Sequence, residues 1–265
     1  MMNLKQWKSK ALIPIGLILS LCLLTQPSSY AAENQYSRAS PESSTYLIRM
    51  DKADLTGDSI PDTIIFSGTK RNPSSSYYDK LNIRVVSPSD SQTINIVLTG
   101  GYNPSLKLLD VNGDHISDIC LSTSQDSNGD TSSLLIYSIQ NHQAVPVPLP
   151  APLNIKGMLK DNYKASVTIQ NTNQTYMLNL LERRTLYDAM GYYQNSRLLK
   201  SAKAIVNGYT KLEPIDRDKD GTWELKGIQP ITIPSNDNTI ALAESLWKWR
   251  YNQWTLVNAK IVSTF

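Results

Sequence analysis

The chain has 265 residues, enough for one large domain or two small ones, with 26 basic and 23 acidic side chains. Three of the basic residues lie within residues 1–31, which contain no acidic residue, so the rest of the chain balances at 23 basic and 23 acidic groups. This balance gives no global reason to expect nucleic acid or an anionic membrane as a partner.

Residues 1–31 have the pattern of a secretory signal peptide. Three lysines precede the apolar run ALIPIGLILSLCLLT, and Ser29 and Ala31 stand at the −3 and −1 positions of a cleavage site. We therefore expect a secreted, extracellular protein that starts near Ala32 and has no stable membrane insertion after cleavage. A retained membrane anchor is the alternative reading of the same run.

Residues 32–45, AENQYSRASPESST, are polar and small and contain proline, which predicts a flexible leader before a domain at 46–265. Alternating apolar and polar residues predict half-buried strands in that domain. More continuous apolar runs predict buried strands at 62–68 and 132–139, and only residues 183–206 have weak helical character. The expected class is mostly β with a short helix. The alternating segments are LNIRVV (81–86), TINIVL (93–98), KASVTIQ (164–170) and LWKWRY (246–251).

The two cysteines have different expected fates. Cys22 follows Leu21, where a lipoprotein would carry a small residue, so lipid attachment is not expected. Cys120 lies in the strand-like run DICLST, and exported proteins usually have paired cysteines or none. A lone thiol in such a run is expected to be a small core residue rather than a nucleophile.

Three short acidic stretches repeat along the chain: DLTGDSIPD at 54–62, DVNGDHISD at 110–118 and DRDKDGTWE at 216–224. Their starts are 56 and then 106 residues apart, and LNIKGMLKDNYKASVTIQ at 153–170 fits the larger gap as a fourth unit with a degenerate loop. Each unit is predicted to contain four strands, with the acidic loop after the first. Four antiparallel strands also make up one propeller blade. We expect a β-propeller-like repeat of about four four-stranded antiparallel units.

The shared pattern D-x-[TND]-x-D-x-x-x-[DE] puts side-chain oxygens at positions 1, 3, 5 and 9, and position 7 offers a backbone carbonyl. Ca²⁺ takes six to eight oxygen ligands, which such a loop can supply. An EF-hand is excluded because position 12 holds Ile65, Leu121 or Gly227. An ordinary polar turn is the alternative, and the near match DSNGD at 126–130 is interpreted as one. The candidate metal ligands are Asp54, Thr56, Asp58, Ile60 and Asp62; Asp110, Asn112, Asp114, Ile116 and Asp118; and Asp216, Asp218, Asp220, Thr222 and Glu224.

The motif D-x-N-G-D-x-x-x-D followed by an apolar strand resembles the FG-GAP/VCBS repeat, the calcium-loop unit of integrin-type β-propellers. The whole chain is similar in arrangement to secreted VCBS repeat-containing proteins. The resemblance implies Ca²⁺ as the bound ion, at the same positions of each loop. The family favours glycine at position 6, which only Gly221 supplies; Ser59 and His115 stand there in the other loops. Because Thr56 is a neutral ligand, we expect the first loop to bind calcium most weakly.

The chain contains no G-x-S-x-G, H-E-x-x-H or phosphate-binding glycine loop, and its only histidines are His115 and His142. His115 is expected to be a solvent-facing turn residue rather than a zinc ligand. No catalytic residue and no other cofactor are expected. The alternative is a carbohydrate-active enzyme acting on cell wall or polysaccharide, because a pair of carboxylates can hydrolyse glycosides.

Aromatic residues gather in three segments and could stack on sugars or dock a protein. They could equally fill the core, because the chain has only two phenylalanines. The predicted function is a secreted calcium-binding β-propeller-like module for extracellular or cell-surface binding or adhesion, with a protein or glycan as partner. The aromatic groups are Trp247, Trp249, Tyr251 and Trp254; Tyr187, Tyr192 and Tyr193; and Tyr77 and Tyr78.

Overall fold

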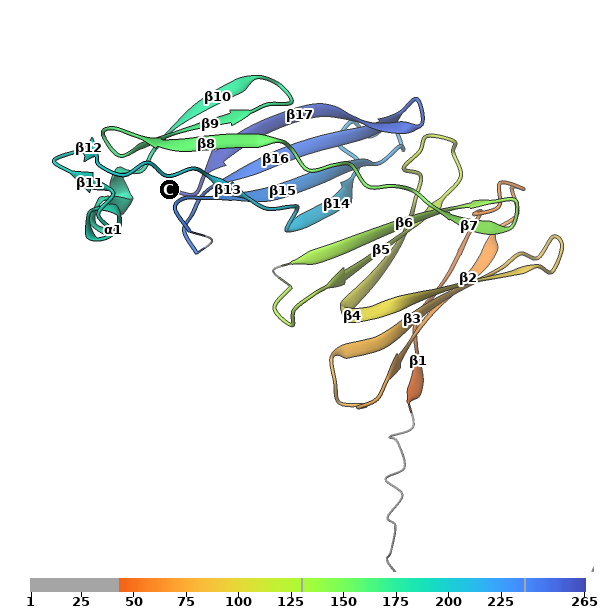
Figure 1. Cartoon of the computed structure of the whole chain (residues 1–265). Helices are drawn as coiled ribbons and strands as arrows, with labels where there is room; N and C mark the ends of the chain where they lie inside the picture. The colour runs from red at the N-terminus through yellow and green to blue at the C-terminus, as the bar shows by residue number, and fades with distance from the viewer. Residues whose placement is uncertain (1–42, 130, 236) are drawn as a thin grey trace, which may run out of the picture. The chain divides into compact units, whose positions relative to one another are not determined.

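A computed structural model of the chain describes residues 43–129, 131–235 and 237–265. The predicted signal peptide and most of the predicted leader lie outside these ranges. The described part is mostly β, as the alternation predicts, and its sheets are antiparallel (Figure 1). None of its helices is both long and apolar enough to cross a membrane.

Among the described residues, the N-terminal half forms one seven-stranded sheet whose strands pair in chain order, so each strand is a neighbour of the next. In β3, Leu81, Ile83 and Val85 are buried while Arg84 between them is exposed, which is the alternation read from the sequence. The strands are β1 (Ser44–Ala53), β2 (Asp62–Lys70), β3 (Tyr77–Val86), β4 (Thr93–Leu109), β5 (Asp118–Ser124), β6 (Ser132–Gln140) and β7 (Gln143–Pro146).

Strand β4 is long because it serves two hairpins. Its first half, up to Tyr102, pairs with β3, and its second half, from Tyr102 to Leu109, pairs with β5. The register shifts between Tyr102 and Ser105, where Asn103 has a left-handed φ of 47°. Both predicted N-terminal units therefore have four strands, and one continuous sheet contains them.

The C-terminal half consists of smaller sheets. Strands β8, β9 and β10 form one, β11 pairs with β12, and β15 pairs with β13, β14 and β16, with β17 beyond β16 (Figure 1). The strands are β8 (Ile155–Lys160), β9 (Lys164–Ile169), β10 (Gln174–Asn179), β11 (Tyr193–Gln194), β12 (Arg197–Leu198), β13 (Ile205–Val206), β14 (Lys211–Ile215), β15 (Glu224–Thr232), β16 (Thr239–Arg250) and β17 (Gln253–Ser263).

The predicted helical segment is shorter than its pattern. A 3-10 turn, η1 (Leu181–Arg183), runs into the six-residue helix α1 (Arg184–Ala189). Gly191, Asn195 and Ser196 then take positive φ values, so the chain turns and continues as short strands. Helix therefore occupies only the start of residues 183–206.

The predicted fourth unit has strands but no acidic loop. Strands β8 and β9 are joined by a turn of three residues, Asp161 to Tyr163, with positive φ at Asn162 and Tyr163. The three units with an acidic loop, in contrast, each have that loop after their first strand and three strands behind it. They are β1 to the first half of β4, the second half of β4 to β7, and β14 to β17.

Two apolar clusters form the core, and β5 contributes to both. Ile119 and Leu121 pack with the N-terminal cluster, whereas Cys120 between them packs with the cluster that includes the C-terminal sheets. Because both faces of β5 are covered, Cys120 is buried, as expected from its apolar strand.

Candidate metal sites in three acidic loops

Each acidic loop closes an antiparallel hairpin with the same register. The residue just before the loop pairs with the residue at position 9, which is also the first residue of the following strand. The paired residues are Ala53 with Asp62, Leu109 with Asp118, and Ile215 with Glu224. The repeat seen in the sequence is therefore a repeat of backbone structure.

The carboxylate at position 9 is buried in all three loops, with Asp62 0%, Asp118 2% and Glu224 2% exposed. One of its oxygens accepts a hydrogen bond from the backbone N–H of position 2, which holds the start of the loop against its end. These N–H···O distances are 2.8 Å from Leu55 to Asp62, 3.0 Å from Val111 to Asp118 and 3.0 Å from Arg217 to Glu224.

Position 5 also repeats its contact. Its carboxylate accepts the backbone N–H of position 7 at 2.8 Å in the first loop and at 2.9 Å in the other two. The pairs are Asp58 with Ile60, Asp114 with Ile116, and Asp220 with Thr222. This bond aims the side chain back along the loop, as in an Asx turn.

The residue at position 1 makes different contacts in the third loop than in the other two. Asp54 accepts the N–H groups of Gly57 at 2.7 Å and Ser59 at 2.8 Å. Asp110 makes the equivalent bonds to positions 4 and 6 of its loop, at 2.6 and 2.9 Å. Asp216 makes neither bond, and its buried Oδ1 has no hydrogen-bond partner.

The three loops stack in series. The backbone N–H of Ser117, at position 8 of the second loop, donates to the carbonyl of Asp54 at 3.2 Å. Trp223, at position 8 of the third loop, donates to the carbonyl of Asp110 at 2.7 Å. Position 8 of the first loop is Pro61, which has no N–H, so the first loop cannot extend the series in the same way.

The second oxygen of the closing carboxylate has a different environment in each loop. In the first loop, Asp62 Oδ1 is buried without a hydrogen-bond partner. In the second, Asp118 Oδ1 accepts hydrogen bonds from the Ser138 hydroxyl and, at 3.4 Å, from the Asn112 amide. In the third, Glu224 Oε1 lies 3.0 Å from the ammonium of Lys248.

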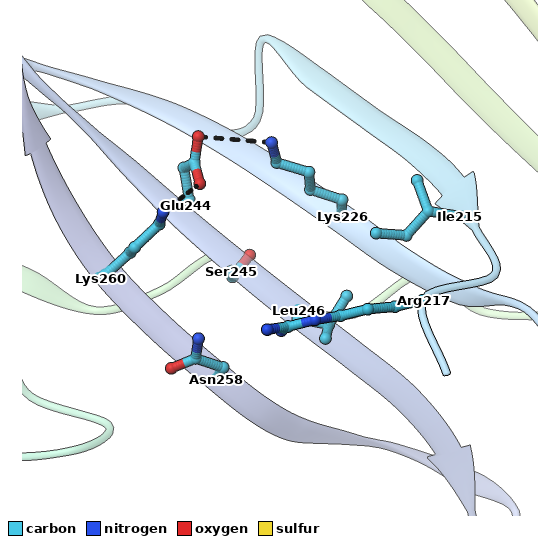
Figure 2. Close-up of a pocket in the computed structure, with 8 residues that line it drawn as sticks. All are labelled: Ile215, Arg217, Lys226, Glu244, Ser245, Leu246, Asn258 and Lys260. Atoms are coloured by element: carbon cyan, nitrogen blue, oxygen red, sulfur yellow. Dashed lines mark ion pairs between the residues drawn. The ribbon is translucent and has the colours of Figure 1, made fainter. Parts of the chain in front are cut away.

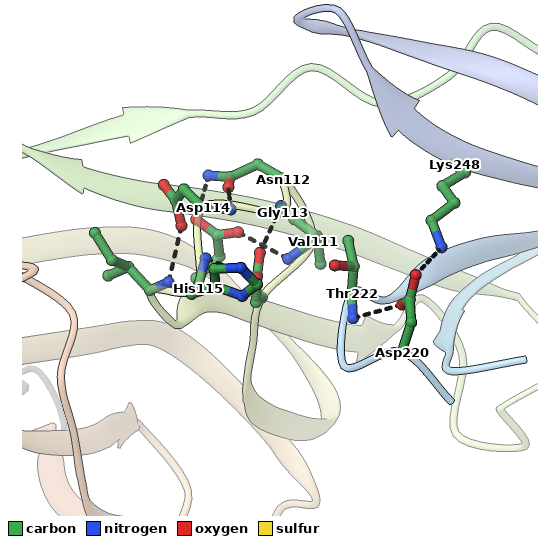
Figure 3. A network of polar contacts seen from close by, with 11 residues as sticks. Val111, Asn112, Gly113, Asp114, His115, Asp220, Thr222 and Lys248 are labelled. Atoms are coloured by element: carbon green, nitrogen blue, oxygen red, sulfur yellow. Dashed lines mark hydrogen bonds and ion pairs between the residues drawn. The ribbon is translucent and has the colours of Figure 1, made fainter. Parts of the chain in front are cut away.

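Lys248 is the functional residue that sequence reasoning missed. Its Nζ lies 2.7 Å from Asp218, 2.6 Å from Asp220 and 3.0 Å from Glu224, and its side chain is only 11% exposed. Figure 3 shows the ion pair with Asp220. Desolvation lowers the pKa of Lys248, but the hydrogen bonds to the three carboxylates outweigh it and hold the pKa above its ordinary value. The alternation in LWKWRY places Lys248 on the opposite face of the strand from Trp247 and Trp249, which does not show its carboxylate partners.

Burial raises the pKa of Asp118 to about 6, against the opposing effect of hydrogen bonds from Ser138 and the Val111 N–H. Neutral donors therefore satisfy this carboxylate only in part.

The third loop brings its carboxylates together most closely. Among the described residues, Asp216, Asp218 and Glu224 are the one group of three His, Cys, Asp or Glu side chains whose ligand atoms all lie within 4.8 Å of one another. His115 is 90% exposed and has a positive φ of 65°, as expected of a solvent-facing turn residue. In the near match at 126–130, Asp126 accepts the Gly129 N–H within the β5–β6 hairpin, as expected of a polar turn.

A shallow polar pocket of about 280 Å³ lies beside the third loop, over β15, β16 and β17 (Figure 2). Glu244 pairs there with Lys226 at 3.3 Å and with Lys260 at 3.2 Å. Arg217 extends across the pocket toward Leu246 (Figure 2). Arg217 is exposed, and within the described part of the chain its guanidinium forms no ion pair.

Three of the aromatic residues that were weighed as ligand contacts lie in the core instead. Tyr187 and Tyr193 are buried and their hydroxyls donate to the backbone carbonyls of Ile233 and Lys160. Trp247 is buried as well, whereas Tyr251 at the β16–β17 turn is 93% exposed. Of the residues weighed as ligand contacts, Tyr77 and Tyr251 are exposed, and four others are half-buried: Tyr78, Tyr192, Trp249 and Trp254.

Comparison with known proteins gives two matches in sequence. The family described as the YybI C-terminal domain matches residues 153–262, a range that includes the third loop and Lys248. The uncharacterized protein YybI of Bacillus subtilis (strain 168) is 28% identical over 239 residues, which cover 88% of this chain and 90% of the relative.

A solved structure, the exotype rhamnogalacturonan lyase YesX, aligns with 83% of this chain at 12% identity and a TM-score of 0.33. This chain spans only 33% of the length of that structure.

Proposed function

We propose that the protein is a secreted, calcium-binding, β-propeller-like module of the FG-GAP/VCBS type, which binds a protein or glycan outside the cell or at its surface. The observation that carries the proposal is the buried carboxylate of Asp62, one oxygen of which has no hydrogen-bond partner.

A buried carboxylate oxygen without a partner is costly unless a cation approaches it. Thr56 Oγ1, at position 3 of the same loop, is also buried and lacks a hydrogen bond. Both atoms are of the oxygen type that Ca²⁺ prefers. Asp54, Asp58 and the Ile60 carbonyl complete the set of residues that would hold the ion, and the bound ion would supply charge neutralisation and tie the loop to β1 and β2.

These contacts change the order of calcium affinity that we propose for the loops. The composition of the first loop suggested the weakest calcium site, but its closing carboxylate has the least satisfied oxygen. The second loop comes next, because Ser138 and Asn112 partly satisfy Asp118.

Thermal unfolding of the protein lacking residues 1–31 tests calcium binding. A ligand that binds only the folded state stabilises it by roughly 2.7 kcal/mol at a hundredfold excess over Kd. We expect a higher Tm in about 2 mM CaCl₂ than in EDTA, since weak extracellular sites bind in this range. Asp62→Asn should remove a large part of that rise, whereas Asp126→Asn, in a polar turn, should not. An equal Tm in CaCl₂ and EDTA would rule out calcium in all three loops.

The propeller-like arrangement of about four units is part of the same proposal. Three units share the order of strands and loop, the register and the inter-loop hydrogen bonds described above, which supports a common repeat. The unit at β8 to β10 would be the degenerate one. This unit departs from the four-stranded blade, because β8, β9 and β10 form a sheet of three strands.

The polar pocket beside the third loop is the surface we propose for the partner. Its unpaired Arg217 guanidinium suits a carboxylate or phosphate group of a protein or glycan. Binding to an array of cell-wall polymers and acidic glycans should weaken about tenfold in Arg217→Ala, which corresponds to the loss of one charged hydrogen bond. Lys203→Ala, a change away from this pocket, should bind normally. Cleavage of the bound polymer would favour the carbohydrate-active enzyme instead.

A further inference from the structure

The three acidic loops differ at one equivalent position on a neighbouring strand. The strand after each loop pairs with the third strand of its unit, and the last paired residues are Thr63 with Val86, Ile119 with Tyr137, and Leu225 with Trp247. One step further along the same antiparallel registers, position 9 faces Ser87, Ser138 and Lys248.

Contacts in two of the units agree with this register. The Ser138 hydroxyl donates to Asp118, and Lys248 pairs with Glu224 at 3.0 Å. In the first unit, Ser87 is buried and its hydroxyl contacts Ser89 at 2.9 Å, so it leaves Asp62 Oδ1 without a partner. Lysine in the third unit thus stands where the other two units have serine.

We propose that Lys248 is the built-in cation of the third loop and that the residue facing position 9 decides whether a loop needs a metal ion. The inference rests on the proposed function for the first two loops, where serine leaves the carboxylates open to calcium. The third loop also has a buried oxygen without a hydrogen-bond partner, Asp216 Oδ1. Its three other carboxylates already pair with the ammonium of Lys248, so we infer that this loop takes no calcium.

The contacts around Lys248 do not fit a metal ion in addition. An ammonium has three protons, and three carboxylates of the loop receive them at 2.6 to 3.0 Å. A divalent cation among the same oxygens would lie within a few ångströms of a positive charge in a partly dry site, where repulsion is strong. Displacing the ammonium would break all three ion pairs of a side chain that is only 11% exposed.

Lys248→Ser gives the third loop the residue of the other two. In EDTA, we expect its Tm to fall by about 10 °C, because Glu224 is left as a buried charge without its partner. In calorimetric titration with CaCl₂ alone, the variant should bind one equivalent more than the wild type, and calcium should restore most of the lost Tm. Lys260→Ser is the matched control, since this lysine pairs with Glu244 outside the loops and is more exposed; its Tm and calcium stoichiometry should stay as in the wild type.

The reciprocal change places a lysine opposite the first loop. Ser87→Lys should lower the calcium stoichiometry by one equivalent and make the first loop independent of EDTA. Ser138→Lys provides the same comparison in the second loop if the first variant does not fold.

The outcomes separate this inference from the proposed function. If the wild type binds no calcium but Lys248→Ser does, Lys248 is the cation of the third loop as inferred, whereas the calcium sites proposed for the two serine-facing loops fail. If the wild type binds calcium and Lys248→Ser binds the same number of equivalents with an unchanged Tm, the inference is overturned and the proposed function stands. A loss of calcium from the wild type on Asp218→Asn would also overturn it, because the third loop would then be a metal site despite its lysine.

Discussion

Residues at position 6 of the acidic loops adopt a left-handed backbone, with φ 66° at Ser59, 65° at His115 and 88° at Gly221. Only glycine reaches this region without a steric cost from Cβ. The hairpin register and the hydrogen bond from position 6 to position 1 require this conformation, so the first two loops retain it with unfavourable residues.

Replacing His115 with glycine should therefore stabilise the protein by about 0.5 to 1 kcal/mol, because the relief of backbone strain exceeds the added freedom of the unfolded chain. The side chain is 90% exposed, so little packing is lost. Urea unfolding in EDTA measures the change. Gly221→His in the third loop is the matched reverse substitution and should destabilise by a similar amount; a His115→Gly variant that is less stable than the wild type would contradict the strain argument.

Cys120 should react slowly with a maleimide reagent in the native state. Burial raises the pKa of its thiol to about 12, so almost none of it is the reactive thiolate at pH 8, and its sulfur is also shielded from the reagent. Mass spectrometry after timed labelling, with and without denaturant, follows the reaction. Rapid native labelling whose rate levels off near about pH 9, as for an ordinary cysteine, would mean that Cys120 is exposed.

At the scale of elements, β4 links two repeat units because its halves pair with different partners. Gly100 lies where β4 approaches its neighbour β3 closely. A Cβ at this position would come within 1.6 Å of the Tyr78 carbonyl oxygen. Backbone atoms at that distance cannot move aside without disturbing the sheet, so the first two units depend on glycine at this point.

Gly100→Ala should destabilise the protein by roughly 2 kcal/mol or more, through overpacking between β3 and β4. Gly208→Ala is the matched control, because a Cβ at Gly208 meets no atom within 4 Å. Chemical denaturation of both variants gives the comparison. Equal midpoints for the two would show that β3 and β4 are not packed this closely.

At the scale of the whole molecule, the proposed export has a direct test. The secreted protein should have an intact mass that begins near Ala32 and carries no acyl group, because the segment 1–31 has the composition of a cleaved signal and Cys22 lacks a lipoprotein context. A mass that retains residues 1–31 would favour the membrane anchor. An acyl increment on the chain would favour a lipoprotein.

Local sequence determined much of this protein. Period-two alternation predicted the half-buried strands around Leu81 and Ala165, because side chains of a strand point to opposite faces whatever it pairs with. The spacing of acidic residues predicted three loops that share a backbone register, because the carboxylates at positions 5 and 9 accept hydrogen bonds within nine residues of chain in all three.

Tertiary structure alone decided that the third loop meets an ammonium. Lys248 is 30 residues from Asp218 in sequence, and only the pairing of β15 with β16 places its ammonium in the third loop. Alternation places Lys248 on the face of the strand opposite Trp247 and Trp249. A period-two pattern cannot reveal a charge partner that another strand supplies. Local patterns also cannot show the partners of Tyr187 and Tyr193. Their hydroxyls donate to the carbonyls of Ile233 and Lys160, which only the fold brings near them.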